Sequence, residues 1–245
     1  PTLDFEEHIR VIELAVYYAH GQAKVMAGTG ANSTAEAIHL TKSAEYAGAD
    51  GSLQVCPYYN KPSQEGLYAH FSTIARSTNL PICLYSIPGR CNVEIDVNTT
   101  LRLAGDCPNI VAMKEAGGTP DRVSQLRAAL DKKFAVLSGD DSMTLPFMSV
   151  GAQGVISVAS NVIPRQLVKM VHGYLKGDAK AARKLHEKYY PLFKDLFIET
   201  NPVPIKAACA KLGLCREEYR LPLVKMHPDN RRKLHATMKA AGVLK

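Results

Sequence analysis

Hydrophobic and polar positions follow two alternating periods along the chain. Short apolar runs rich in β-branched residues predict strands at 24–27, 52–56, 81–87, 110–114, 135–138 and 154–158. Amphipathic stretches between these runs predict helices at 33–48, 64–77, 98–106, 120–130, 142–150 and 164–176. One more helix is expected before the first strand, with an apolar face formed by Ile9, Ile12, Val16 and Ala19. The pattern is β-α repeated six times behind a single helix.

Apolar strands that alternate with helices indicate a parallel sheet covered on both faces, and hence an α/β fold. An open doubly wound sheet and a (β/α)8 TIM barrel both fit this pattern. No G-x-G-x-x-G follows the first strand, which weakens the dinucleotide-binding version of the open sheet. The strand pattern stops near residue 177, after which 178–198 and 230–242 predict helices. We therefore expect a β/α domain at 1–176, which as a barrel would lack its first two strands, and a C-terminal helical domain at 177–245.

The number of strands is smaller than a complete barrel requires. A TIM barrel has eight strands, whereas this sequence predicts six and starts with a helix. Because each β-α unit spans about 25 residues, we expect about 50 further residues with two strands to precede residue 1 in the complete protein. Six strands alone would leave two sheet edges and much apolar surface exposed.

The composition is that of a soluble globular enzyme, with 46% apolar and 22% charged residues. It excludes a disordered chain, a collagen-like chain and a coiled coil. No apolar run reaches the roughly 18 residues of a membrane span, and no secretory signal is visible at residue 1. We therefore expect no membrane association and a cytoplasmic location, or a plastid location if the source is a plant.

The formal charge of +7 is concentrated in the last quarter of the chain. Residues 177–245 hold 15 Lys and Arg against 7 Asp and Glu. No aromatic residues are interleaved with the basic run Arg231–Lys233, so a solvated helical face is a better interpretation than nucleic-acid binding.

The six cysteines form no C-x-x-C pair, and two lie inside strand-like runs. Buried free thiols in a reducing compartment are expected rather than disulfides.

Lys114 is the strongest chemical signal in the sequence. It lies at the end of the strand-like run 110–114, and the carboxyl ends of parallel strands carry the active sites of α/β folds. Apolar walls there would lower the pKa of the amine, and a neutral amine can attack a carbonyl to form a Schiff base. A strand-end lysine that simply extends to solvent is the alternative.

Two further side chains occupy equivalent positions one strand earlier. Tyr85 could exchange protons beside a Schiff-base lysine, although a buried structural tyrosine is the alternative. Arg90 follows in the next loop, where its guanidinium could bind a carboxylate through two hydrogen bonds. Lys114, Tyr85 and Arg90 map to the same end of neighbouring strands. Their joint placement is therefore stronger evidence for an active site than any one of these residues alone.

Three other features are more ambiguous. The loop 57–62 contains adjacent aromatic residues of the kind found at subunit contacts. For Asp140 and Asp141, helix capping is a better interpretation than a site wall or a metal ligand. The eight histidines show no metal-binding spacing, so we expect no metal site.

Taken together, these motifs resemble the dihydrodipicolinate synthase family of the pyruvate-dependent class I aldolases, which also include N-acetylneuraminate lyase. The resemblance runs almost from end to end and rests on Ala27–Asn32, Pro57–Gly66, Tyr85–Arg90, Met113–Ala116, Leu137–Asp141, Gly154–Val158 and Asn201–Lys206. The segment Pro57–Gly66 and Arg90 favour the synthase over the sialate lyase. The resemblance implies condensation of pyruvate with L-aspartate-4-semialdehyde to give 4-hydroxy-tetrahydrodipicolinate, the first committed step of lysine and diaminopimelate biosynthesis.

The resemblance also implies roles for individual residues. Lys114 would form the Schiff base with pyruvate, Tyr85 would shuttle protons, and Tyr59 would complete the relay from a neighbouring subunit. Arg90 would bind the semialdehyde carboxylate, and the backbones of Gly139 and Ile156 would line the pyruvate site. No cofactor beyond the covalent pyruvate adduct is implied, and the assembly would be a homotetramer built as a dimer of dimers.

A regulatory site is implied as well. Many relatives are inhibited by lysine, and the positions that match this site are His8, Asn32, Glu36 and Tyr58. Phe5 stands where some lysine-sensitive members have histidine, and Thr2 does not match the relay threonine of the family.

Two rival functions remain. One is another pyruvate aldolase, such as N-acetylneuraminate lyase or an aldolase for a sugar acid or hydroxy-oxoglutarate. The other is a non-catalytic relative.

Overall fold

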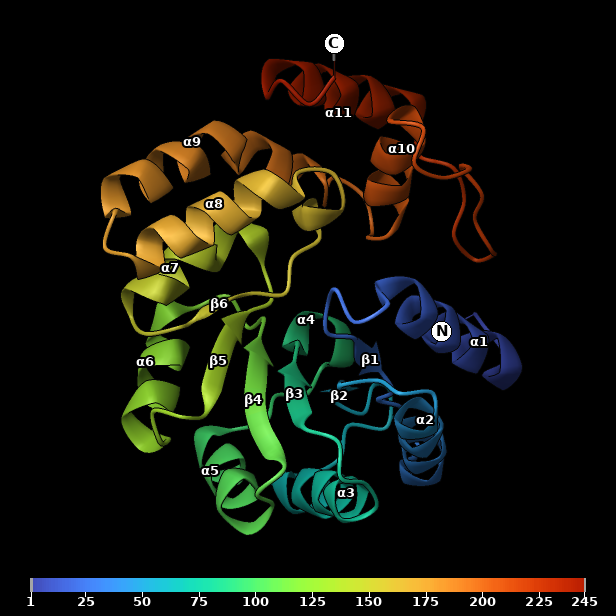
Figure 1. Ribbon diagram of the computed structural model, residues 1–245, viewed down its shortest axis with the longest axis vertical. Coiled ribbons are helices and arrows are strands. Elements are labelled where there is room, and N and C mark those ends of the chain that lie inside the picture. Colours follow the sequence, from blue (N-terminus) through green and yellow to red (C-terminus); the bar gives the residue numbers. More distant parts are fainter. Residues whose placement is uncertain (1, 245) are drawn as a thin grey trace. The chain divides into compact units, whose positions relative to one another are not determined.

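The computed structural model of the protein describes residues 2–244. Six strands form one sheet in chain order, and the pairs β1–β2, β2–β3 and β3–β4 are parallel (Figure 1). They are β1 (Met26–Gly28), β2 (Gly51–Val55), β3 (Ile82–Ser86), β4 (Ile110–Glu115), β5 (Ala135–Ser138) and β6 (Gly154–Val155). A doubly wound sheet reverses its strand order at a switch point, and this sheet does not. The order is that of a β/α barrel wall, as predicted.

The chain divides into two compact units. The first comprises Leu3–Leu137 with Val150–Ala152, and the second comprises Thr2, Ser138–Ser149 and the chain from Gln153 onward. The division therefore falls within β5. The expected separation of a barrel domain at 1–176 from a helical domain at 177–245 stays a prediction.

In the first unit, one helix precedes the first strand, and the longer helices that follow the strands lie outside them (Figure 1). The helices of this unit are α1 (Phe5–Ala19), α2 (Thr34–Tyr46), α3 (Gln64–Arg76), α4 (Pro88–Cys91), α5 (Val97–Asp106) and α6 (Pro120–Ala129). Asp4 and Glu7 form the capping box that starts α1, and the Ser33 hydroxyl accepts from the Glu36 N–H at the start of α2. Ile12 of α1 packs with Ala44 of α2 in an apolar cluster, which fixes the first helix to this unit.

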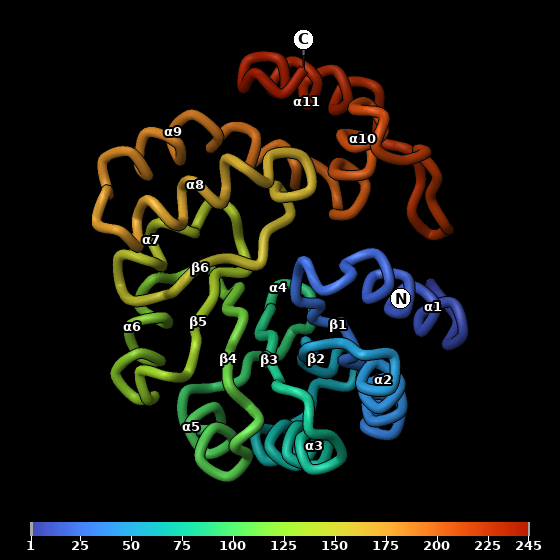
Figure 2. Tube along the Cα trace, in the orientation of Figure 1, coloured from blue at the N-terminus to red at the C-terminus, as the bar shows by residue number. Residues whose placement is uncertain are grey.

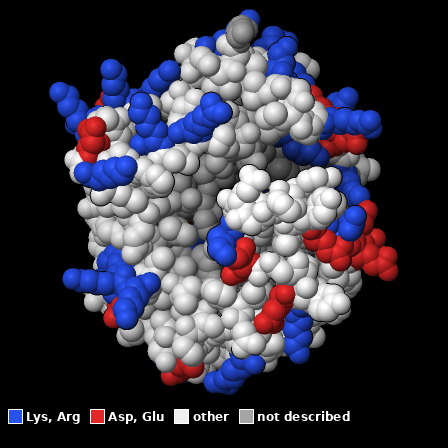
Figure 3. All heavy atoms as spheres, in the orientation of Figure 1, with Lys and Arg blue, Asp and Glu red and all other residues white. Residues whose placement is uncertain are grey.

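The second unit is mainly helical. Besides β6, it contains η1 (Asp141–Met143), α7 (Thr144–Ser149), η2 (Ala159–Asn161), α8 (Pro164–Leu175), α9 (Ala179–Asp195), α10 (Val203–Lys211) and α11 (Pro228–Ala240). Helices α8 and α9 lie side by side, as the tube in Figure 2 also shows. The exposed side chains of α9 include Lys180, Arg183, Lys184 and Lys188, and basic residues gather over this helix at the upper left of Figure 3. This part of the basic excess is a solvent-exposed helical face, and the interpretation of the rest stays a prediction.

All six cysteines are free thiols, as the sequence predicts. Cys56, Cys83, Cys91 and Cys107 are buried, Cys209 is half-buried, and Cys215 is exposed. Burial raises the pKa of Cys83 to about 12, because the thiolate would lose its hydration. None of the helices within residues 2–244 has an apolar stretch long enough to cross a bilayer.

Candidate active site

Lys114 and Tyr85 face each other at the carboxyl ends of two adjacent strands. They are partners in the parallel register of β3 and β4, and the Lys114 Nζ lies 4.0 Å from the centre of the Tyr85 ring. Both side chains are half-buried, so each contacts the interior and remains reachable. A lysine ammonium above the electron-rich face of a phenol is a favourable arrangement, and the contact places the lysine nitrogen next to a proton donor.

The phenol of Tyr85 is held in its protonated form. Burial raises the pKa of Tyr85, because the phenolate would lose its hydration, and the nearby Arg90 guanidinium only partly offsets this effect. Tyr85 therefore carries a proton at neutral pH that it can donate to a reacting oxygen or nitrogen.

Arg90 follows Tyr85 on the single turn α4. Pro88 suits the first turn of a helix, because it lacks the N–H that would have no partner there, and Asn92 ends the turn with a left-handed φ of 55°. This places Arg90 five residues beyond Tyr85 with an exposed side chain. The first unit thus holds all three residues predicted from strand ends.

The aromatic loop after β2 projects Tyr59 outward. Tyr59 is 91% exposed and has a left-handed φ of 75°, which is uncommon for a residue with a side chain. Tyr58 is 38% exposed, and its carbonyl accepts from the Asn32 amide at 3.2 Å. The Asn60 amide returns a hydrogen bond to the Asn32 carbonyl at 2.9 Å, so this loop is fixed to the loop that follows β1.

The loop after β1 is held tightly against β2. A Cβ on Gly30 would lie 2.3 Å from the Val55 nitrogen, so only glycine fits at that position. Behind it, the buried Gln54 amide lies 2.7–2.8 Å from the hydroxyls of Thr29, Thr41 and Ser52. These contacts fix the backbone that leads to Asn32.

The four positions expected to form a regulatory site all belong to the first unit. The His8 Nε2 is 2.8 Å from the Gly28 carbonyl at the end of β1, and Asn32 contacts Tyr58 as described above. Burial raises the pKa of Tyr58, and the carboxylate of Glu36 adds to that effect. The structure therefore brings Asn32, Glu36 and Tyr58 together and places His8 at the end of the neighbouring strand.

Gly139 and Ile156 lie in the second unit. The Ile156 N–H donates to the Ser138 carbonyl at 2.9 Å, which joins β6 to the end of β5. Asp140 caps η1 by accepting from the Ser142 N–H at 2.7 Å, as expected. The buried Asp141 carboxylate accepts from the N–H groups of Val158 and Ala159, each at 3.0 Å. It thereby caps η2 and holds the segment that follows Ile156.

Two charged residues beside the site were not predicted from the sequence. Glu115 directly follows Lys114 and is fully buried, and Arg122 of α6 is 8% exposed with its Nε 3.4 Å from a Glu115 carboxylate oxygen. The alternation of side chains along a strand could have located Glu115, because it turns this residue away from the Lys114 side and into the helix layer. A carboxylate in that layer requires a buried partner.

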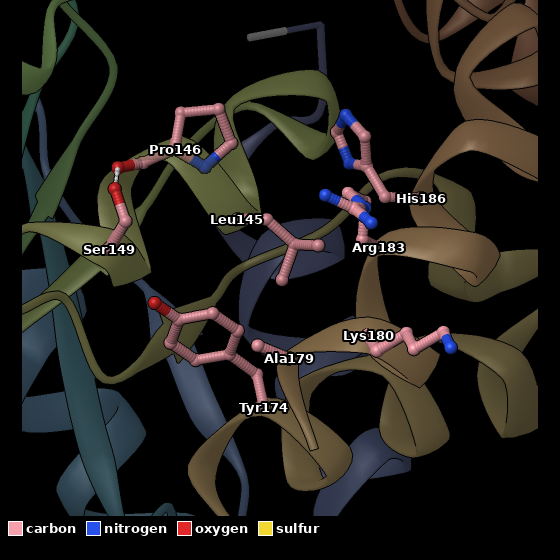
Figure 4. Close-up of a pocket in the computed structure, with 8 residues that line it drawn as sticks. All are labelled: Leu145, Pro146, Ser149, Tyr174, Ala179, Lys180, Arg183 and His186. Carbon is pink, nitrogen blue, oxygen red and sulfur yellow. Dashed lines mark hydrogen bonds between the residues drawn. The ribbon is translucent and has the colours of Figure 1, made fainter. Parts of the chain in front are cut away.

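A separate cavity of about 510 Å³ lies in the second unit. Figure 4 shows Leu145 and Tyr174 beside it, with Arg183 and His186 of α9 at its edge. The Ser149 hydroxyl at its rim already donates to the Pro146 carbonyl at 2.7 Å. None of the predicted site residues lines this cavity, so we place the candidate active site at the ends of β3 and β4.

Comparison with known proteins gives one consistent family. The Dihydrodipicolinate synthetase family profile matches residues 1–241. The 4-hydroxy-tetrahydrodipicolinate synthase of Aquifex aeolicus is 54% identical over 98% of this chain and 81% of its own length. The structure of the synthase from Methylacidiphilum fumariolicum has a TM-score of 0.98 at 57% identity, covering 99% of this chain and 81% of that one. An Acinetobacter baumannii dihydrodipicolinate synthase complexed with pyruvate has a TM-score of 0.96 at 43% identity, covering 99% and 83%.

Proposed function

Because the chain belongs to the dihydrodipicolinate synthetase family, we propose that it is a lyase that condenses pyruvate with L-aspartate-4-semialdehyde to 4-hydroxy-tetrahydrodipicolinate. This reaction is the first committed step of lysine and diaminopimelate biosynthesis. The observation that carries the proposal is the contact between the Lys114 amine and the Tyr85 ring at the ends of adjacent strands. The pyruvate bound to the Acinetobacter relative supports the first substrate.

In the proposed mechanism, the Lys114 amine attacks the ketone carbon of pyruvate and water leaves as the iminium forms. Loss of a methyl proton gives the enamine, whose carbon attacks the aldehyde of the semialdehyde. The amine of the bound semialdehyde then displaces Lys114 in the cyclisation, which releases the product and restores the lysine. One water is released overall, and no metal or further cofactor is needed.

The other residues handle protons and charge. Tyr85 donates and accepts protons during these steps, because its raised pKa keeps it protonated between them. Tyr59 completes the relay from a neighbouring subunit, and its outward position in the first unit supports this role. The working assembly is a homotetramer built as a dimer of dimers, in the cytoplasm. Arg90 binds the semialdehyde carboxylate.

Lysine, the end product of the pathway, is proposed to bind at His8, Asn32, Glu36 and Tyr58. The contact between Asn32 and Tyr58 and the closeness of Glu36 to Tyr58 support this site. A carboxylate such as Glu36 suits an ammonium group, and an amide suits the amino-acid backbone.

Covalent trapping tests the proposal. The protein is incubated with pyruvate, reduced with borohydride and analysed by intact mass and peptide mapping. One reduced pyruvate on Lys114 is expected, and Lys114→Arg should abolish both the adduct and turnover while preserving the charge. Lys24→Arg, at an exposed ion pair with Asp50, is the matched control and should behave like the wild type. An adduct on another lysine, or none on the wild type, would disprove the proposal.

A further inference from the structure

The carboxylate of Glu115 is buried directly behind Lys114. Glu115 is 0% exposed, although burying an unpaired carboxylate is costly. The chain compensates for this cost through the loop that follows β4, where the Gly117 N–H donates to the Glu115 Oε1 at 2.5 Å. A Cβ on Gly117 would lie 2.7 Å from that same oxygen, so any larger residue at 117 would displace the Glu115 carboxylate.

Arg122 joins this carboxylate to a second segment. Its Nε lies 3.4 Å from Glu115 and 3.9 Å from Glu94, and its guanidinium donates to the Ile95 carbonyl. One planar guanidinium therefore spans the residue after Lys114 and the residues after α4. A lysine could not make these contacts together, because its ammonium is a single point of charge.

The segment after α4 is also held by a second helix. The Gln64 amide of α3 donates to the Glu94 carbonyl at 2.8 Å and accepts from the Asp96 N–H at 3.1 Å. Residues 94–96 are thus clamped between Gln64 and Arg122. Because Arg90 lies only four residues before Glu94, the same clamp fixes the end of the turn that carries Arg90.

We propose that the buried Glu115–Arg122 ion pair is a positioning device that sets the place of Arg90 relative to Lys114. Lys114 and Arg90 follow different strands, β4 and β3. Arg122, held by Glu115 beside Lys114, reaches across to the segment after Arg90 through Glu94 and the Ile95 carbonyl. The inference rests on the proposed function of Lys114 and Arg90. The second substrate is a short aldehyde that bears a carboxylate. By setting the position of Arg90, the ion pair controls how this substrate is oriented toward the enamine.

A double-mutant cycle tests this role. Arg122→Lys and Glu115→Gln are each made in the wild-type and Arg90→Ala backgrounds, with Arg102→Lys, from an exposed pair with Glu65, as the matched control. In the wild-type background each variant should raise the KM for the semialdehyde by about tenfold, a size typical of directly coupled residues. In the Arg90→Ala background the same change should have little further effect. The KM for pyruvate and the extent of borohydride trapping should stay near wild type.

Each outcome decides the matter. An equal rise in the KM for the semialdehyde in the wild-type and Arg90→Ala backgrounds would mean that the pair only stabilises the fold. A parallel loss of pyruvate trapping would mean the same, and either result would overturn the inference. If Glu115→Gln does not fold by circular dichroism, the cycle with Arg122→Lys, which keeps the charge, decides. A wild-type protein without a Lys114 adduct would instead refute the proposed function, so the two failures are distinguishable.

Discussion

The Lys114 amine lies 4.0 Å from the centre of the Tyr85 ring, and the two residues are register partners on neighbouring parallel strands. Their separation is therefore set by the spacing of the sheet rather than by a loop. A proton donor and a nucleophile held in this way need little rearrangement when a substrate binds.

Replacing Tyr85 with phenylalanine should remove proton transfer while keeping the ring beside Lys114. We expect kcat to fall roughly 100-fold, the lower end of what general acid–base catalysis contributes. The pyruvate adduct should still be trapped, because the amine remains. Tyr68→Phe, which removes an exposed hydroxyl that donates to Asp106, is the control and should leave kcat within twofold. A Tyr85→Phe enzyme with wild-type kcat would exclude the proton-shuttle role.

Gly30→Ala should destabilise the protein, because the new Cβ would lie 2.3 Å from the backbone nitrogen of Val55. A clash with backbone cannot be relieved by a rotamer change, so we expect a loss of about 3 kcal/mol in the free energy of unfolding. Urea denaturation measures it. Gly28→Ala is a matched control two residues away, since nothing lies within 4 Å of its Cβ position. Equal stability of the two variants would contradict the close approach of this loop to β2.

Stability should depend on pH through His70 of α3. Burial lowers the pKa of His70 from 6.5 to about 4, and its Nδ1 is paired with the Thr34 hydroxyl at 2.8 Å. The unfolded chain binds a proton below pH 6.5 and the folded chain does so only near pH 4, so stability falls as the pH drops between these values. After allowance for solvent screening we expect a loss of about 2 kcal/mol.

Urea unfolding at pH 7.5 and pH 4.5 measures this dependence. His70→Asn should flatten it by removing the titrating group. His39→Asn, at an exposed position of α2, should keep the wild-type slope. An unchanged slope in His70→Asn would rule out His70 as its source.

Added lysine should lower the initial rate and raise the melting temperature, because a ligand that binds only the folded state stabilises it. Glu36→Gln removes the carboxylate that would pair with the ammonium group of lysine. The lysine concentration needed for both effects should therefore rise about tenfold. Glu13→Gln, from an exposed pair on α1, is the control. Inhibition of equal strength in wild type and Glu36→Gln would place the lysine site elsewhere.

Much of the fold follows from the pattern of apolar residues, and the departures have physical reasons. The range predicted for β5 is the observed one. The predicted strand at 154–158 ends at Val155, because the Asp141 carboxylate accepts the N–H groups of Val158 and Ala159. Helix α10 was not among the predicted helices, because Pro202 and Pro204 suggest a break, yet proline is tolerated in the first turn of a helix.

Some residues of the candidate site could be predicted from the sequence, and others could not. Lys114 and Tyr85 could be located because parallel strands present their carboxyl ends at one edge. The clamp around Ile95 could not, since it depends on Arg122 reaching a carbonyl 27 residues away. The left-handed backbone of Tyr59 is likewise set by its loop and not by any local sequence preference.

The distribution of cysteines gives the protein its own reporter of unfolding. Four thiols are at most 2% exposed, whereas Cys215 lies at the surface. An alkylating reagent applied to the native protein should therefore modify Cys215 first, and modification of Cys56 or Cys91 would record each opening of the region around β2 and α4. The rate of that labelling, with and without pyruvate, would show whether substrate binding closes the same region whose geometry the active site depends on.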